Sequence, residues 1–217
     1  MNDEMRMYLE SVARRRIDGE DAAHDFEHAR RVMMNALKIG AAEGGDVDVL
    51  IPAALFHDVM MFPKNDPRSD DAAHQSAMMA VGILQSTDGY PAAKIQRVAD
   101  AITHCSFGNP ADGLPLDALI LQDADRLEAT GAIAIMRTFW SAGQMGQPLY
   151  DPDDPFARSR QADGLRYAFD LFETRLLRVE ARMNTGTGRE LARSRTAFLR
   201  TFMTQFNDDL LMTRETL

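Results

Sequence analysis

The five histidines of this sequence, the side chains best suited to bind a metal ion near neutral pH, all lie in its first half. They are His24, His28, His57, His74 and His104. Two short motifs set histidines beside acids, namely HDFEH at 24–28 and HD at 57–58. Imidazole nitrogen and carboxylate oxygen suit Mn, Fe, Co, Ni or Zn. The pattern therefore indicates a metal site.

A third acidic motif, QDADRLEATGAIAI at 122–135, is predicted to begin a helix that is otherwise rich in apolar and small residues. Three or four ligands from different helices would make a catalytic site with positions left for water or substrate. Adjacent helical residues diverge by about 100°. His57 and Asp58 can therefore share an ion only if they lie near a helix end or if one side chain reaches around the helix. A loop begins just after them, which makes this plausible.

The elements that must position these residues are helical almost throughout. Hydrophobic periodicity and capping residues predict helices over 5–16, from Asp25 to about 42, over 47–59, 72–85, 92–103, 115–139, 166–179 and 188–211. Residues 61–71 are predicted to form a loop and 143–160 an irregular stretch, and no convincing strand alternation occurs. We predict one all-α domain over 1–217. Its motif-bearing core covers about 20–140, and helices at about 165–211 pack on that core.

Composition narrows the class of partner. A formal net charge of −9 argues against binding to nucleic acid polymers or anionic membranes and favours a small substrate. The single cysteine, Cys105, excludes an internal disulfide and is predicted to be a small buried residue. The N-terminal stretch lacks the apolar region of a signal peptide, and no segment approaches the roughly 18 apolar residues of a membrane span. These features predict a cytoplasmic protein.

Three motifs together carry a resemblance to a known family. HDFEHARRV (24–32), AALFHDV (53–59) and DADRLEATGAI (123–133) resemble the H…HD…D pattern of the HD superfamily of metal-dependent phosphohydrolases, whose domain is an all-helical bundle. PKNDP after the HD pair, HCSF at 104–107 and DPFARSR at 154–160 are similar to a branch of small bacterial cytoplasmic HD hydrolases.

The resemblance implies a ligand set for a divalent ion, which would be Mn, Co, Ni, Fe, Mg or Zn. The expected ligands are His28, His57, Asp58 and Asp125. Asp123 is the alternative to Asp125 as the fourth ligand. Residues two positions apart on a helix point about 200° apart around its axis, so the two aspartates are not expected to bind the same ion in the same way.

Further roles are expected around that ion. Asp25, Glu27 and Asp123 are the candidates for general acid or base, although His24 or Asp25 could instead only cap the helix. Lys64, His104, Arg126 and His24 are expected at the substrate. Lys64 would supply a point charge to a phosphate, its alternative being a solvated loop lysine, and Arg126 could instead form a pair on the helix surface.

The resemblance predicts hydrolysis of a phosphomonoester or phosphoanhydride, with a nucleotide or deoxynucleotide as the favoured substrate. One alternative is a di-iron HD-fold oxygenase, which would need His74 and His104 as extra ligands. The other is a regulatory module that binds a nucleotide without turnover. The assembly state is left open, with a homodimer compatible with the sequence.

Overall fold

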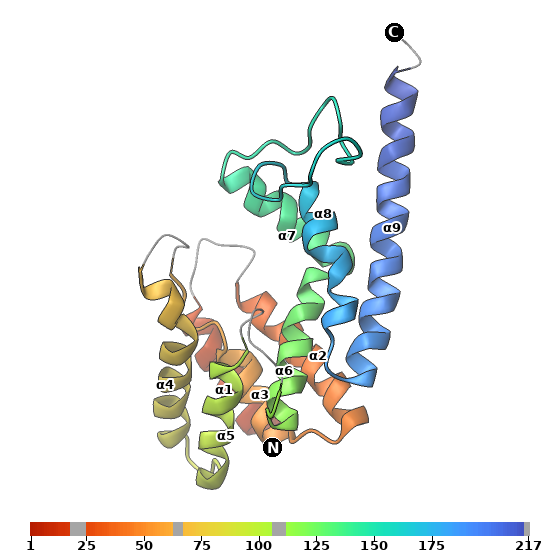
Figure 1. Ribbon diagram of the computed structural model, residues 1–217. Coiled ribbons are helices and arrows are strands. Elements are labelled where there is room, and N and C mark those ends of the chain that lie inside the picture. Colours follow the sequence, from red (N-terminus) through yellow and green to blue (C-terminus); the bar gives the residue numbers. More distant parts are fainter. Residues whose placement is uncertain (18–24, 63–66, 106–111, 215–217) are drawn as a thin grey trace. The chain divides into compact units, whose positions relative to one another are not determined.

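The computed structural model describes residues 1–17, 25–62, 67–105 and 112–214, and every regular element among them is helical. The order is α1 (Asp3–Arg16), α2 (Phe26–Glu43), α3 (Val47–Phe56), η1 (Pro67–Asp71), α4 (Ala72–Gln85), α5 (Ala92–Thr103), α6 (Leu116–Arg126), η2 (Leu127–Ala129), α7 (Gly131–Gln144), α8 (Asp170–Thr174), η3 (Leu176–Arg178), η4 (Glu180–Arg182) and α9 (Gly186–Arg214) (Figure 1). The predicted all-α class is confirmed.

Helix α2 begins and ends where its local sequence requires. The side chain of Asp25, the N-cap residue, accepts a hydrogen bond from the backbone N–H of His28 at 2.8 Å. At the other end Gly44 has φ +88°, a left-handed conformation that glycine adopts without steric cost, and its N–H donates to the carbonyl oxygen of Gly40. The predicted boundaries of this helix are confirmed.

Helix α3 forms the centre of the first half of the fold. All eight residues from Val49 to Phe56 are buried, and α1, α2, α4, α5 and α6 each pack against this helix. The helix stops at Phe56, three residues before the predicted end, and His57 is its C-cap. Asp58 therefore lies in the turn after the helix, which frees its side chain from the 100° spacing of adjacent helical residues.

The prediction of one helix over 115–139 is wrong. The chain forms α6, then η2, and starts α7 after a break in which Thr130 is extended and Gly131 has φ +66°. A side chain at Gly131 would be strained and would lie 3.3 Å from Cβ of Arg195. The break also places Asp123 and Asp125 near the end of α6, whereas their motif was predicted to begin a helix.

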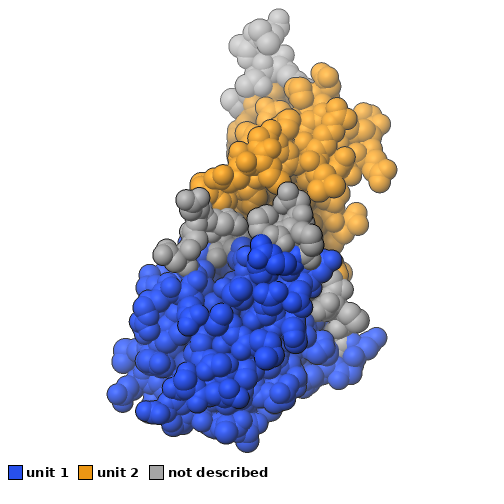
Figure 2. All heavy atoms as spheres, turned by 90° about the vertical axis from the view of Figure 1, so that its left-hand side faces the viewer, with its two compact units in different colours: residues 1–126, 184–188 blue, residues 127–183, 189–217 orange. Residues whose placement is uncertain are grey.

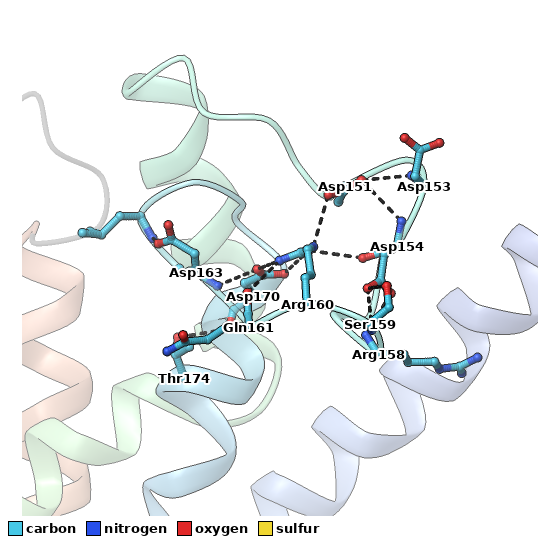
Figure 3. Close-up of polar contacts among 12 residues, drawn as sticks. Asp151, Asp153, Asp154, Arg158, Ser159, Arg160, Gln161, Asp163, Asp170 and Thr174 are labelled. Atoms are coloured by element: carbon cyan, nitrogen blue, oxygen red, sulfur yellow. Dashed lines mark hydrogen bonds and ion pairs between the residues drawn. The ribbon is translucent and has the colours of Figure 1, made fainter.

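An arginine holds the long irregular segment between α7 and α8. The guanidinium of Arg160 donates to both carboxylate oxygens of Asp170 and pairs with Asp151 at 3.1 Å. Figure 3 shows Arg160 between Asp170 on one side and Asp151 and Asp154 on the other. Asp170 also accepts the backbone N–H of Asp163 at 2.7 Å. The segment was predicted to be irregular, and these contacts give it a defined structure in place of helix.

Aromatic packing supplies the second half of the fold with its own core. Phe169 and Phe172 stack with ring centroids 4.6 Å apart, and Phe202 and Phe206 of α9 pack against them. The predicted helix over 166–179 is shorter than expected, because only α8 is α-helical there and η3 is a 3₁₀ turn.

The described chain divides into two compact units. Unit 1 comprises Met1–Arg126 with Asn184–Gly188, and unit 2 comprises Leu127–Met183 with Arg189–Leu217 (Figure 2). The prediction that residues 1–217 form a single domain stays a prediction. A search of the described helices finds none with the length and apolar character needed to cross a membrane.

Candidate metal centre

The centre is built from three helix ends in unit 1. His28 lies in the first turn of α2, His57 caps the C-terminus of α3 and Asp125 is the penultimate residue of α6. Helix α2 packs against both α3 and α6, which brings these ends together. Asp58 joins them from the turn after α3.

Four donor atoms converge at the centre. The Nε2 atoms of His28 and His57 lie 3.3 Å apart. Oδ2 of Asp58 lies 3.7 Å from the first of these nitrogens and 3.4 Å from the second. Oδ1 of Asp125 lies 3.6 Å and 3.9 Å from the same two atoms. Donors about 2.1 Å from a tetrahedral ion would be separated by roughly 3.4 Å. His28, His57 and Asp125 each offer a ligand atom within 4.8 Å of the other two, so these three residues can hold a divalent cation, and Asp58 lies beside both imidazoles.

The tautomer of His57 is determined by its neighbour. Nδ1 lies 2.8 Å from the carbonyl oxygen of Ala54. A carbonyl can only accept, so Nδ1 carries the proton and Nε2 keeps a lone pair for a metal. Both histidines are buried, with 1% of His28 and 4% of His57 exposed. Two buried imidazoles beside two carboxylates are expected to be stabilised better by a bound cation than by water alone.

A small cavity adjoins the donors. Its volume is about 110 Å³, and its lining includes His57, Asp58 and Asp125 together with Ser69 and Asp70 of η1. This volume suits water molecules or a phosphoryl group and lies well below the roughly 300 Å³ of a pocket for a whole small-molecule ligand. Ser69 and Asp70 were not predicted to belong to the site, because nothing in their local motif distinguishes them from an ordinary polar loop.

Cys105 also lines this cavity. Only 4% of it is exposed, and burial raises the pKa of its thiol, as do Asp125 and Asp58 to a smaller extent. The thiol therefore stays protonated near neutral pH, as its predicted role as a small buried residue requires.

The structure brings Asp125, and not Asp123, to the histidines. Asp123 is fully buried and accepts hydrogen bonds at 2.8 Å from the backbone N–H groups of Asn184 and Thr185 and from the Thr185 hydroxyl. Burial raises the pKa of the Asp123 carboxyl, and these hydrogen bonds oppose the shift. Its oxygens are thus engaged with the segment that leads into α9, and its predicted acid–base role gains no support.

Three other residues with predicted roles in the site, Glu27, Asp25 and His104, form surface ion pairs or cap helices. Glu27 forms ion pairs with Arg14 at 3.2 Å and Arg30 at 3.3 Å on the exposed side of α2. Asp25 caps α2, the structural role considered for it. His104, which was predicted to bind the substrate, caps α5, and its Nδ1 lies 2.7 Å from the carbonyl oxygen of Asp100.

Of the other three residues expected at the substrate, the structure describes only Arg126. Arg126 is 4% exposed and lies 3.7 Å from Asp123 in an ion pair, so it is not a helix-surface residue. His24 and Lys64 fall outside the described residues.

Comparison with known proteins agrees with this geometry. The HD domain family matches residues 25–130, the range that contains the four donors. The protein YpgQ of Bacillus subtilis, which is uncharacterized, is 31% identical over 212 residues, covering 96% of this chain and 93% of the relative.

Solved structures extend the likeness to the fold. The crystal structure of Bacillus subtilis YpgQ in complex with ADP has 29% identity and a TM-score of 0.71, covering 95% of both chains. An HD-superfamily hydrolase from Bacillus thuringiensis has 25% identity and a TM-score of 0.69, covering 95% of this chain and 96% of its own. With a matching domain, a relative that spans almost its whole length and the expected donors at one point, this chain belongs to the HD superfamily and has the fold of its hydrolases.

Proposed function

We propose that the protein is a metal-dependent phosphohydrolase that cleaves a phosphomonoester or phosphoanhydride bond of a nucleotide. The observation that carries the proposal is the convergence of two imidazole nitrogens and two carboxylate oxygens beside a cavity of about 110 Å³. A cavity of that size accommodates the reacting phosphoryl group and water, while the rest of a nucleotide would lie outside it.

Residues of this chain prepare the site for such a reaction. When bound, a divalent ion would lower the pKa of a water molecule and stabilise the charge that develops on a phosphoryl oxygen. Ala54 holds His57 so that Nε2 faces the donors. Asp70 lines the same cavity, and its carboxylate can accept a hydrogen bond from the attacking water.

Two observations support the choice of substrate class. A relative of this chain, YpgQ, has been crystallised in complex with ADP. The net charge of −9 would repel a long polyanion such as a nucleic acid, whereas a single nucleotide carries few charges and is repelled less.

The di-iron alternative gains no support from the described residues. It needs His74 and His104 as additional ligands, but His74 is exposed on α4 and His104 caps α5. Neither belongs to the group of donors around His28.

The test combines metal reconstitution with ligand removal. Protein freed of metal by a chelator and supplied with Mn²⁺, Co²⁺, Ni²⁺ or Mg²⁺ should release phosphate or pyrophosphate from a panel of nucleotides. Loss of a residue that only hydrogen-bonds to a metal ligand weakens metal binding by roughly 10–100-fold. His57→Ala and Asp58→Ala should each weaken metal binding by more than this, while His74→Ala should bind metal as the parent does. Turnover that survives both ligand substitutions would exclude this mechanism.

A further inference from the structure

A second, larger hollow lies along α4 in unit 1. Its volume is about 550 Å³, within the range of pockets that hold small-molecule ligands. Three methionines line it, Met60, Met78 and Met79, together with Gly82, Ile83 and Arg16. We call this hollow the methionine groove.

Helix α4 and the turn after α3 each contribute residues both to the methionine groove and to the cavity of the metal centre. Ala72, in the first turn of α4, lines the cavity, and Met79 and Ile83 follow it at seven and eleven positions along one face of the helix. From Ala72 to Met79 the helix rises by about 10 Å. This length is comparable with the span from the phosphates of a nucleotide to its base.

The turn after α3 also links the two hollows. Asp58 lines the cavity, and Met60, two residues later, lines the groove. The Ser76 hydroxyl of α4 holds this turn by accepting the N–H of Met60 at 3.1 Å. A ligand that occupied both hollows would have its phosphates at the donors and would pass Met60 to reach the groove.

The lining of the groove suits a flat aromatic ring. Thioether sulfur makes favourable contacts with aromatic rings, and methionine adapts its shape to the ring that it meets. Arg16 of α1 donates from Nη1 to Sδ of Met79 at 3.2 Å. Because sulfur is a weak acceptor, this guanidinium can turn to stack on a base or to hydrogen-bond one of its carbonyl groups.

We propose that the methionine groove holds the base of the nucleotide whose phosphates lie at the His28–His57–Asp58–Asp125 donors. The inference rests on the proposed function and adds to it the place where the nucleoside part is recognised. It predicts that a phosphate compound without a base uses the metal centre alone.

Gly82 allows a test that fills the groove with little strain. A Cβ built at Gly82 meets no atom within 4 Å, and leucine has a higher helix propensity than glycine. Gly82→Leu should fold normally and raise the KM for nucleotides about tenfold, the equivalent of ~1.4 kcal/mol of binding. The ratio of the nucleotide rate to the pyrophosphate rate should fall by the same factor. Gly143→Leu is the matched control, since Gly143 of α7 also has no atom within 4 Å of a built Cβ.

The possible outcomes distinguish a failure of the groove proposal from a failure of the proposed function. An unchanged nucleotide-to-pyrophosphate ratio in Gly82→Leu overturns the groove while the hydrolase stands. If the parent protein hydrolyses no substrate, the proposed function fails, and calorimetry with ADP still decides the groove. Weaker binding by Gly82→Leu than by Gly143→Leu then supports the groove, and equal binding, or no binding to the parent, overturns it.

Discussion

Asp123 and Asp125 lie two residues apart on α6, yet their carboxylates face different partners. Oδ1 of Asp125 lies 3.6 Å from Nε2 of His28, whereas both oxygens of Asp123 accept hydrogen bonds from Asn184 and Thr185. Residues two positions apart on a helix point about 200° apart around its axis. The end of α6 therefore presents Asp125 to the candidate metal centre and anchors the start of α9 through Asp123.

Replacing Asp123 by asparagine should weaken the fold and spare metal binding. Both carboxylate oxygens accept N–H groups, so an amide nitrogen in place of either one leaves a buried donor without an acceptor. We expect Asp123→Asn to lower the free energy of unfolding by about 2–4 kcal/mol in urea titrations. Metal affinity should stay within a few-fold of the parent, and Asp209→Asn, on the exposed side of α9, should change neither quantity. Loss of metal affinity with unchanged stability would contradict this assignment.

A methyl group at Gly188 should also destabilise the anchor. A Cβ there would lie 2.4 Å from Oδ2 of Asp123, an atom that two hydrogen bonds from Thr185 hold in place. Gly188→Ala should therefore cost about 1–3 kcal/mol of stability, although alanine normally favours a helix. Gly143→Ala, on α7 with open space around it, should cost nothing. Thermal unfolding of the two variants compares the effects, and equal melting temperatures would rule out the close approach.

Lys94 should contribute to the free energy of unfolding near neutral pH and lose this contribution in acid. Its Nζ lies 2.7 Å from Asp48 and 2.8 Å from Asp46, and the hydrogen bond from Lys94 lowers the pKa of Asp48. An acid with a depressed pKa in the folded state contributes stability above its unfolded pKa of about 3.9 and loses it as the pH falls through the folded value.

The corresponding measurement is a pH series of urea unfolding curves. Lys94→Met should be less stable than the parent by about 1 kcal/mol at pH 7, and the difference should shrink as the pH falls below about 4. Lys38→Met, an exposed lysine of α2, should follow the parent throughout. A constant difference between Lys94→Met and the parent at every pH would show that the ion pair does not act through Asp48 and Asp46.

Arg160 should be essential to the stability of unit 2. It pairs with Asp170, of which only 2% is exposed, so its removal leaves a buried carboxylate without its cation. Arg160→Met should cost about 2–4 kcal/mol, below the full value for a buried pair because Arg160 itself is partly exposed. Trp140 of α7, the single tryptophan, reports the unfolding of this unit by fluorescence. Arg200→Met on α9 is the control, and equal transitions in the two variants would contradict the role of Arg160.

The sequence by itself predicted the residues that approach one another at the candidate metal centre and most of the helices that carry them. Periodicity predicted α4 and α5 closely, and periodicity with capping residues predicted α2, because these signals are local to each helix. The resemblance of the H…HD…D motifs to the HD superfamily implied His28, His57 and Asp58 as ligands, because these residues match the family pattern in type and order.

Only the tertiary structure decided which neighbour each side chain meets. It separated Asp125 from Asp123, paired Glu27 with surface arginines and added Asp70 to the cavity. It also broke the predicted helix over 115–139 at Gly131, against which the side chain of Arg195 packs. These outcomes depend on contacts between residues as far apart in the sequence as His28 and Asp125, or Asp123 and Asn184, which no local pattern of polarity encodes.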